Sequence, residues 1–442
     1  MSSCRGWAEH LRSVSLQRRI GWVRRVHGLA MEAEGPRVAV GELCRVATLG
    51  IGAGAGVLAE VVGLQRDHVT LMAYGSLQAV AAGAEVVALG QQGSIGVGPA
   101  LLGRVIDGFG DPLDGLERPA TPFLRALHAP APNPLQRPRI REVLETGVRA
   151  IDALLTLGRG QRVGIFAGSG VGKSTLLGMI ARHVKADVNV IALIGERGRE
   201  VREFVERQLG PQGLGRSVVV VATSDQPALA RLRAAHAAVA IAGHFAAGGA
   251  AVVLTMDSIT RLAMARREVG LAAGEPATAR GYTPSVFAEL PQICERCGTS
   301  PSGGSVTALM TVLVEGDDLN EPIADSLRSI LDGHIVLSRD LAEQGHYPAI
   351  DPLRSASRLL PELADADERK LAGAAVRQLA VLQRNRQMVD IGAYQAGTNA
   401  ALDAALAVDG GLRAWLQQAT GGVHRSDAMR ELGTALAAGG QR

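Results

Sequence analysis

The chain has 442 residues, of which 47% are apolar and only 3% are aromatic, so we expect two or three domains with largely aliphatic cores. A formal charge of +3 is close to balance and does not indicate a nucleic-acid-binding or membrane-surface protein. Four cysteines are too few for a disulfide framework, which favours a reducing compartment. Cys294 and Cys297 form an isolated CxxC pair without the further ligands of a zinc site.

The first 27 residues are strongly basic, with one acidic residue, Glu9, and six arginines: Arg5, Arg12, Arg18, Arg19, Arg24 and Arg25. Trp7, Leu11 and Val14 would share one face of a helix. Two interpretations stay open for this segment, a solvated N-terminal helix and a helix that docks on a partner. The start is too polar for a secretory signal.

Residues 28–95 are rich in short apolar runs that are typical of β-strands. The runs GVLAEVVGL and HVTLMAY are separated by the polar turn QRDH, and glycine-rich breaks recur at 50–56 and 89–98. We therefore predict a first domain over residues 1–95 that consists of a small β-barrel behind the basic leading segment.

From about residue 160 the chain carries nearly continuous apolar runs: 162–166, 188–195, 217–223, 251–256 and 305–314. Strands without apolar–polar alternation, spaced by helical segments, indicate a parallel sheet that is covered on both faces. The most apolar window, 237–256, is rich in Ala and Gly and is interrupted at His244 and Gly248, so we expect a helix, a turn and a buried strand rather than a membrane span. The predicted second domain, over 96–365, is an α/β core.

The strand pattern stops after about residue 360. Leu371, Ala375, Leu379 and Leu382 recur at steps of three and four residues, as on one face of a helix. Residues 366–442 are therefore predicted to form a third, helical domain.

One stretch of the second domain fits the Walker A phosphate-binding pattern. Residues 168–175 read GSGVGKST and follow Ala167, which replaces the first glycine of the pattern. Backbone N–H groups of such a loop hold phosphate oxygens, and a helix that begins near Lys173 adds its positive end. In this pattern Lys173 reaches the β- and γ-phosphates and the Ser174 hydroxyl binds Mg²⁺. The stretch predicts a site for a nucleotide with Mg²⁺.

Two acidic residues stand at the ends of apolar runs. Asp257 closes VVLTMD, which fits the Walker B pattern, and we expect it to hold Mg²⁺ through a water molecule. Glu196 follows the run at 188–195, and ligands of parallel sheets bind at the carboxyl ends of the strands. Glu196 is therefore a candidate to orient or deprotonate an attacking water. The next residue, Arg197, is placed to pair with Glu196 or with phosphate.

Long stretches of the chain resemble one protein family over about residues 25–410. They include the phosphate loop with its flanks, VIALIGERGREVREF, TSDQPALARLRAA, EGDDLNEPIADSLRSILDGHIVLSRDLAEQGHYPAID and GAYQAG. The chain is similar to the ATPases of type III secretion systems, of the injectisome and of flagellar export, which in turn resemble the catalytic subunits of rotary ATP synthases.

This resemblance implies residue roles. Glu196 matches the catalytic glutamate, Tyr347 the aromatic residue that stacks on adenine, and Arg358 in LRSASR the arginine finger. The residues of the implied nucleotide loop are Gly168, Ser169, Gly170, Val171, Gly172, Lys173, Ser174 and Thr175. Because the chain carries both Glu196 and Arg358, head-to-tail association can complete its sites in a closed ring.

The resemblance also implies an assembly and partners. They are a homohexamer at the cytoplasmic face of the membrane, a stator-like negative regulator, a coiled-coil central stalk, a membrane export gate and chaperone–substrate complexes. ATP hydrolysis would release chaperones from export substrates and unfold them.

Three other functions were weighed. A rotary synthase subunit is disfavoured because its glutamate and finger lie on different subunits. A hexameric RNA translocase would stack bases on barrel aromatics, and residues 28–95 hold only Tyr74. A nucleotide-binding subunit without catalysis should lack Glu196. The sequence leaves the choice between injectisome and flagellum open.

Overall fold

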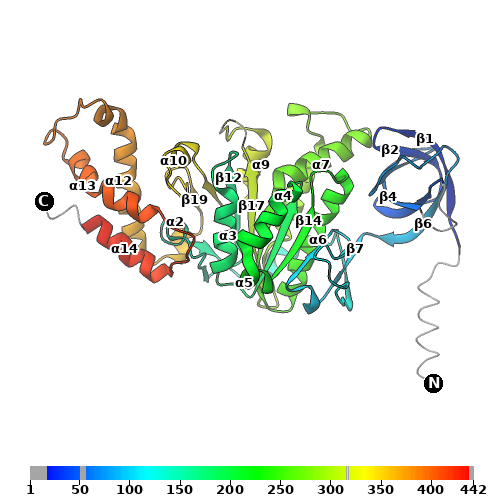
Figure 1. Cartoon of the computed structure of the whole chain (residues 1–442), viewed down its shortest axis with the longest axis horizontal. Helices are drawn as coiled ribbons and strands as arrows, with labels where there is room; N and C mark the ends of the chain where they lie inside the picture. The colour runs from blue at the N-terminus through cyan, green and yellow to red at the C-terminus, as the bar shows by residue number, and fades with distance from the viewer. Residues whose placement is uncertain (1–16, 50–55, 315, 317, 438–442) are drawn as a thin grey trace, which may run out of the picture.

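A computed structural model describes residues 17–49, 56–314, 316 and 318–437 of the chain. Three parts follow one another along its longest axis (Figure 1): a barrel at the N-terminal end, a sheet covered by helices in the middle, and a group of helices at the C-terminal end. The predicted α/β architecture, with a small barrel before the sheet and helices after it, is confirmed.

The barrel closes in the strand order β1-β2-β5-β4-β3-β6. Its strands are β1 (Ile20–His27), β2 (Ala30–Glu34), β3 (Glu42–Ala47), β4 (Gly56–Leu64), β5 (Val69–Ala73) and β6 (Glu85–Gln92). Alternate residues point inward, so Cys44 and Val46 of β3 are buried while Arg45 between them is exposed. The interior is aliphatic and includes Val23, Met31 and Leu71.

The prediction of a helix over the basic N-terminal segment is wrong for residues 20–27. Residues Ile20–His27 form β1, because the chain here pairs with β2 and β6 and its arginines find glutamate partners. Arg24 lies 2.9 Å from Glu34, and Arg25 lies 2.9 Å from Glu32, both across the β1–β2 hairpin. Two further ion pairs join Arg18 to Glu85 and Arg19 to Glu42. Arg5, Trp7, Glu9, Leu11, Arg12 and Val14 lie outside the described residues.

The central sheet has nine strands, in the order β19-β18-β12-β17-β15-β13-β14-β8, with β16 paired to β17. The strands are β8 (Arg104–Ile106), β12 (Arg162–Ala167), β13 (Val188–Ile194), β14 (Ser217–Ala222), β15 (Ala251–Asp257), β16 (Gly298–Thr299), β17 (Ser305–Leu313), β18 (Gly333–Val336) and β19 (Ala356–Ser357). β19 and β16 are antiparallel to their neighbours, and the other pairs are parallel. The five apolar runs are thus adjacent parallel strands, as predicted.

Helices cover both faces of the sheet, which explains why its strands are apolar throughout. Val190 and its neighbour Ile191 in β13 belong to different cores on opposite faces. One face carries α6 (Ala228–Ala247), α7 (Ile259–Ala272), α8 (Pro284–Glu295) and α9 (Pro322–Ile330). The other carries α2 (Arg149–Leu154) and α3 (Lys173–His183). The window 237–256 is the end of α6, a turn and β15, as expected.

Shorter elements complete the central part. They are β7 (Ser94–Val97), β9 (Phe123–Ala126), β10 (Val143–Leu144), β11 (Leu157–Gly158), α4 (Gly198–Glu203), the π-helix Phe204–Leu209, α5 (Gly210–Gly215), α10 (Arg339–Glu343), α11 (Leu360–Leu363) and three 3-10 turns at Pro99–Leu101, Pro134–Gln136 and Ala279–Gly281. β7 pairs with β9 in a ribbon that lies along α6. Cys294 and Cys297 are both buried in the core, and burial raises the pKa of the Cys297 thiol to about 12.

The C-terminal helices are α12 (Ala366–Asp390), α13 (Ala400–Leu416) and α14 (Arg425–Ala437). Asp365 and Glu368 form a capping box that begins α12. Ala375 is buried and Leu371 and Leu379 pack beside it, so the predicted apolar face exists. This face packs toward α2, which joins the helical part to the sheet.

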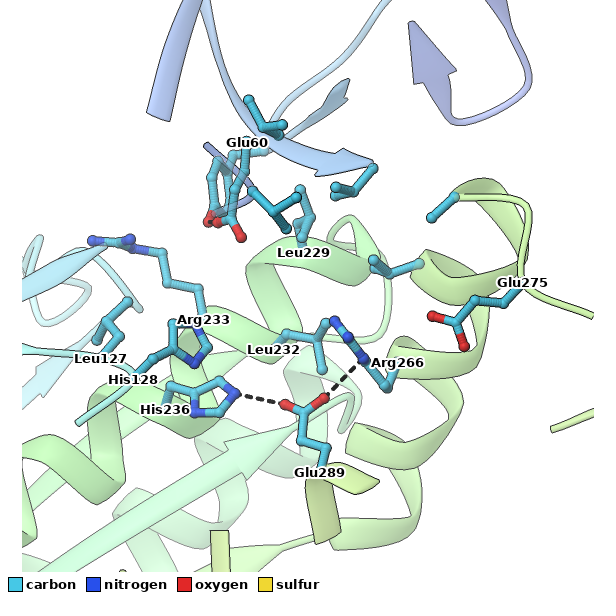
Figure 2. A pocket seen from close by; sticks show the side chains of 16 residues that line it. Glu60, Leu127, His128, Leu229, Leu232, Arg233, His236, Arg266, Glu275 and Glu289 are labelled. Atoms are coloured by element: carbon cyan, nitrogen blue, oxygen red, sulfur yellow. Dashed lines mark hydrogen bonds and ion pairs between the residues drawn. The ribbon is translucent and has the colours of Figure 1, made fainter. Parts of the chain in front are cut away.

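The junction between barrel and sheet is polar and internally paired. Figure 2 shows that Glu289 of α8 accepts a 2.6 Å hydrogen bond from His236 of α6 and lies 3.0 Å from Arg266 of α7. Burial opposes ionisation of Glu289, but the hydrogen bond from His236 and the nearby cations keep its pKa below the usual range. On the barrel side, Tyr74 donates a hydrogen bond to Glu60. Arg233 of α6 lies over the Tyr74 ring, 5.7 Å from its centroid, and so connects the helix to the barrel. Within the described residues, no helix is long and apolar enough to cross a membrane.

Candidate active site

The phosphate loop connects β12 to α3 at the carboxyl edge of the sheet. β12 ends at Ala167 and α3 begins at Lys173, as the pattern requires. Gly172 has φ 85°, and a Cβ atom there would lie 3.2 Å from the ring of Tyr347. Only glycine fits this conformation beside the ring. The loop is held from inside by Val171, which is buried.

Lys173 and the two predicted acids meet at this edge. The Lys173 ammonium contacts Asp257 Oδ1 directly and lies 3.5 Å from Glu196 Oε1. The Thr311 hydroxyl of β17 donates a 2.7 Å hydrogen bond to the same Asp257 oxygen. Glu196 follows β13 and Asp257 ends β15, and these strands are adjacent and parallel, so their carboxyl ends coincide. Three side chains that are separated by up to 84 positions are thus brought together.

Glu196 is buried rather than an exposed charge, with 8% of its surface accessible. Burial raises the pKa of Glu196 to about 7, and the negative charge of Asp257 adds to the rise, while Lys173 opposes it. A carboxylate with this proton affinity is suited to accept a proton near neutral pH.

Arg197 does not pair with Glu196. Its side chain is 75% exposed and its Nη1 lies 3.4 Å from Glu200 Oε1. The turn into α4 directs Arg197 to the surface, since Glu196 points inward and the next residue points the other way. The predicted pairing of Arg197 with Glu196 is therefore wrong, and the side chain pairs with Glu200 instead.

Arg261 is a neighbour of Glu196 that the sequence reasoning missed. It lies in the first turn of α7, and its side-chain carbons would lie 3.1 Å from a Cβ placed on Gly195. Its Nε is buried and has no hydrogen-bond partner among the described residues, and its charge lowers the pKa of Glu196. The available signal was an arginine one helical turn after the strand-ending Asp257.

A cavity of about 440 Å³ lies between the phosphate loop and the helical part. Its lining includes Tyr347, which is 45% exposed, and the 418–420 connection between α13 and α14. The Gln418 backbone N–H donates a 3.0 Å hydrogen bond to the Tyr347 carbonyl. The Gln418 side chain is buried and donates to Gly147 O at 2.8 Å. No local pattern in the sequence marks these residues, because they contact Tyr347 only through the fold.

The residues present fit a nucleotide with Mg²⁺. The glycine loop with Lys173 suits phosphates, and an apolar cavity with one aromatic ring suits a base. Ser174 is exposed on the first turn of α3, and Asp257 supplies a carboxylate. Among the described residues, no group of three or more His, Cys, Asp or Glu side chains could hold a metal. A magnesium ion here would therefore depend on phosphate oxygens and water for its other ligands.

Arg358 lies at the opposite edge of the sheet from these groups. β19 pairs with the start of β18, and Gly333 of β18 is in register with Val163 near the start of β12. The Arg358 backbone N–H donates to Asp332 O at 3.0 Å, and the side chain is exposed without a partner among the described residues. One chain therefore does not bring Arg358 to its own phosphate loop.

Family models match most of the chain. Residues 147–357 match the nucleotide-binding domain of the ATP synthase alpha/beta family, and residues 23–90 match its beta-barrel domain. Residues 364–434 match the T3SS EscN ATPase C-terminal domain.

Relatives and solved structures agree with these matches. The flagellum-specific ATP synthase of Bacillus subtilis is 51% identical over 91% of this chain and 92% of its own. The type 3 secretion system ATPase of Xanthomonas euvesicatoria is 46% identical over 96% of each chain. The assembled ATPase EscN of the enteropathogenic E. coli type III secretion system superposes with a TM-score of 0.89 at 43% identity, over 94% of this chain and all of that one. The chain therefore belongs to the ATP synthase alpha/beta family and, within it, to the ATPases of type III secretion and flagellar export.

Proposed function

We propose that this chain hydrolyses ATP with Mg²⁺ and that hydrolysis energises protein export through a type III apparatus, injectisome or flagellar. The observation that carries the proposal is the meeting of Lys173, Glu196 and Asp257 beside the phosphate loop. Relatives of both systems share about half of the residues over nearly the whole chain, which supports the export role.

Each residue at this edge has a proposed part in binding. Backbone N–H groups of residues 168–175 hold phosphate oxygens, and Lys173 turns from the two carboxylates to the β- and γ-phosphates. The ring of Tyr347 stacks on the base. Ser174 and, through a water molecule, Asp257 would hold Mg²⁺, which would supply positive charge to the phosphates.

In hydrolysis, Glu196 orients the attacking water and accepts its proton. Its burial and raised pKa suit this task at neutral pH. Arg261, next to Glu196, and Arg197, which would leave Glu200, are proposed to stabilise negative charge on the γ-phosphate. The remaining cation, Arg358, comes from another copy, because its own sheet separates it from its own loop.

Such an arrangement requires head-to-tail association, and we propose a homohexameric ring. The related ATPase EscN has been solved in assembled form and in complex with its central stalk EscO, and the second structure superposes with a TM-score of 0.86. By analogy, a coiled-coil stalk is a proposed partner here. A stator-like negative regulator, a membrane export gate and chaperone–substrate complexes are proposed too, with the ring peripheral to the cytoplasmic membrane. We also propose that the three domains of the chain span residues 1–95, 96–365 and 366–442.

Two alternatives are less well supported. The C-terminal match to the T3SS EscN domain and the presence of Glu196 and Arg358 on one chain favour an export ATPase over a rotary synthase subunit. An RNA translocase would need aromatic side chains on the barrel on which bases can stack. Tyr74 is poorly suited to this role, because it is only partly accessible and its hydroxyl donates a hydrogen bond to Glu60. Trp22 is the one large exposed ring on the described barrel strands.

The test uses Glu196→Gln, which keeps size and polarity but cannot accept a proton. The purified variant should bind ATP normally and lose hydrolysis, and cells that carry it in place of the natural chain should lose export. Nucleotide affinity and turnover are measured on one sample. Loss of both together would show that Glu196 has a structural role, and retained export without hydrolysis would refute the coupling.

A further inference from the structure

A second cation lies beside Arg358 at the amino edge of the sheet. Arg328 of α9 and Arg358 line one hollow of about 300 Å³, together with Asp325, Ser329 and His334. The sequence reasoning singled out Arg358 alone. Arg328 carries the same group into the same space from a different element.

Both guanidinium groups lack partners. Neither the Arg328 nor the Arg358 side chain makes a hydrogen bond or an ion pair with any residue that the structure describes, and the Nε of Arg328 is buried without an acceptor. Asp325, one turn before Arg328 on α9, makes no ion pair with it. Elsewhere on this edge, arginines are satisfied: Arg162 lies 3.0 Å from Asp332 and also contacts Glu295.

His334 joins the two arginines into one unit. It lies in β18 and lines the same hollow, its Nε2 donates a 3.0 Å hydrogen bond to the Arg354 carbonyl, and its backbone is in register with Ala356 of β19. Burial and the positive charges of Arg328 and Arg358 lower the pKa of His334, and an imidazole has no negative charge that could offset the two cations. The hollow therefore has two guanidinium groups against one carboxylate.

We propose that Arg328 acts with Arg358 as a pair of cations that one copy presents to the nucleotide phosphates bound at the neighbouring copy's loop. The inference rests on the proposed function, because it needs the head-to-tail contact. In that contact the amino edge of one sheet faces the carboxyl edge of the next, and phosphate supplies the negative charge that the hollow lacks. Two planar guanidinium groups from separate elements can grip different phosphate oxygens.

The first test is turnover of purified Arg328→Ala. We expect kcat to fall about 10- to 100-fold, as for loss of a hydrogen bond to a charged group, while ATP affinity of the isolated chain is unchanged. Arg328→Lys keeps the positive charge but loses the planar, bidentate guanidinium group, and it should recover part of the rate. Arg384→Ala is the matched control, an exposed helical arginine without a partner in the described residues, and should turn over normally. Normal turnover of Arg328→Ala would overturn the inference.

The second test separates a role across the interface from a role within the chain. Arg328→Ala is mixed with Glu196→Gln, and Arg358→Ala with Glu196→Gln, each under conditions of demonstrated co-assembly. With equal mixing, about a quarter of the interfaces carry both intact groups, so activity should return in both mixtures. Recovery only with Arg358→Ala would place Arg328 in its own chain's structure and overturn this inference alone. Recovery in neither mixture would refute the shared site of the proposed function.

Discussion

The two edges of the central sheet differ in how their charges are satisfied. At the carboxyl edge, Lys173 contacts both Asp257 and Glu196, so cation and acids are paired within one chain. At the amino edge, Arg328 and Arg358 share a hollow and neither has a partner among the described residues. One edge holds a cation in contact with acids, and the other has an excess of positive charge.

This difference indicates that each chain carries two halves of a nucleotide site, one on each edge of its sheet. Unpaired cations cost little at an exposed edge but become useful beside phosphate. The parallel topology enforces the separation, because the phosphate loop must follow a strand end and β19 returns to the start of β18. The predictions below test each half.

The largest effect should come from the paired edge, in Lys173→Ala. Removal of this ammonium takes away the cation that reaches the phosphates and leaves two carboxylates facing each other. We expect turnover to fall at least about 10³-fold and ATP binding to weaken sharply. Turnover and nucleotide affinity of the purified variant are the measurements. Lys185→Ala is the control, since Lys185 is half exposed and, in the described part of the chain, its side chain pairs with Glu145 alone. Near-normal turnover of Lys173→Ala would refute the phosphate-loop assignment.

The unpaired edge is tested by Arg358→Ala. The variant should assemble but turn over about 10³-fold more slowly or worse, because an arginine finger typically contributes that much. Wild-type specific activity should rise with protein concentration as rings form, and then level off. The turnover and the size of the assemblies are measured for the variant and for the wild type at each protein concentration. Specific activity that is independent of concentration, with dissociated chains present, would contradict a site shared between copies.

Much of the paired edge was predictable from the sequence, because its signals are local. Continuous aliphatic runs gave β13 and β15, and an acid at the end of each run identified Glu196 and Asp257. Parallel strands then brought those acids together with the phosphate loop. The sequence could not show which way Arg197 points, since that depends on the turn into α4.

Contacts between distant segments were not predictable. Gln418 reaches Tyr347 only after the helical part packs on α2, and Arg328 joins Arg358 only after β18 and β19 pair. The helical spacing of Trp7, Leu11 and Val14 predicts a helix for the N-terminal segment, but this pattern does not extend into residues 20–27, which form β1. In the fold, Arg24 and Arg25 pair with glutamates of β2, and this information lies in the hairpin rather than in the segment.

The pH dependence of turnover sharpens the account of the paired edge. Glu196 must be ionised to accept a proton, and burial raises its pKa to about 7. Its active form is therefore lost as pH falls through neutrality, and kcat/KM should decline by about tenfold per pH unit below 7. The residual rate of Glu196→Gln is the control and should lack this step. A flat profile from pH 6 to pH 8 would contradict the role of Glu196 as proton acceptor.

A smaller effect is expected at the base cavity beside the paired edge. Tyr347→Ala removes the ring near Gly172 and should raise KM for ATP about 5- to 100-fold, since a stacked base is worth roughly 1–3 kcal/mol. Stacking on the base stabilises the bound ATP and the transition state equally, so kcat should be largely retained. Tyr347→Phe keeps the ring and should behave like the wild type. Saturation curves give both constants, and a large fall in kcat would count against a base-binding role.

The smallest effect on hydrolysis should come from the N-terminal segment that precedes β1 in the sequence. Deletion of residues 2–16 leaves β1 and the ion pairs Arg18–Glu85 and Arg19–Glu42 in place, so basal turnover should be unchanged. Deletion of residues 2–27 would instead remove β1 and open the barrel, and serves as the disruptive comparison. The shorter deletion removes Arg5 and Arg12 with the apolar residues Trp7, Leu11 and Val14, which together suit docking on an acidic surface. We therefore expect weaker binding to a stator-like partner or to acidic liposomes at low salt, measured by pull-down and sedimentation. Unchanged binding would end the docking hypothesis, and a large loss of basal turnover would show that this segment reaches one of the two edges.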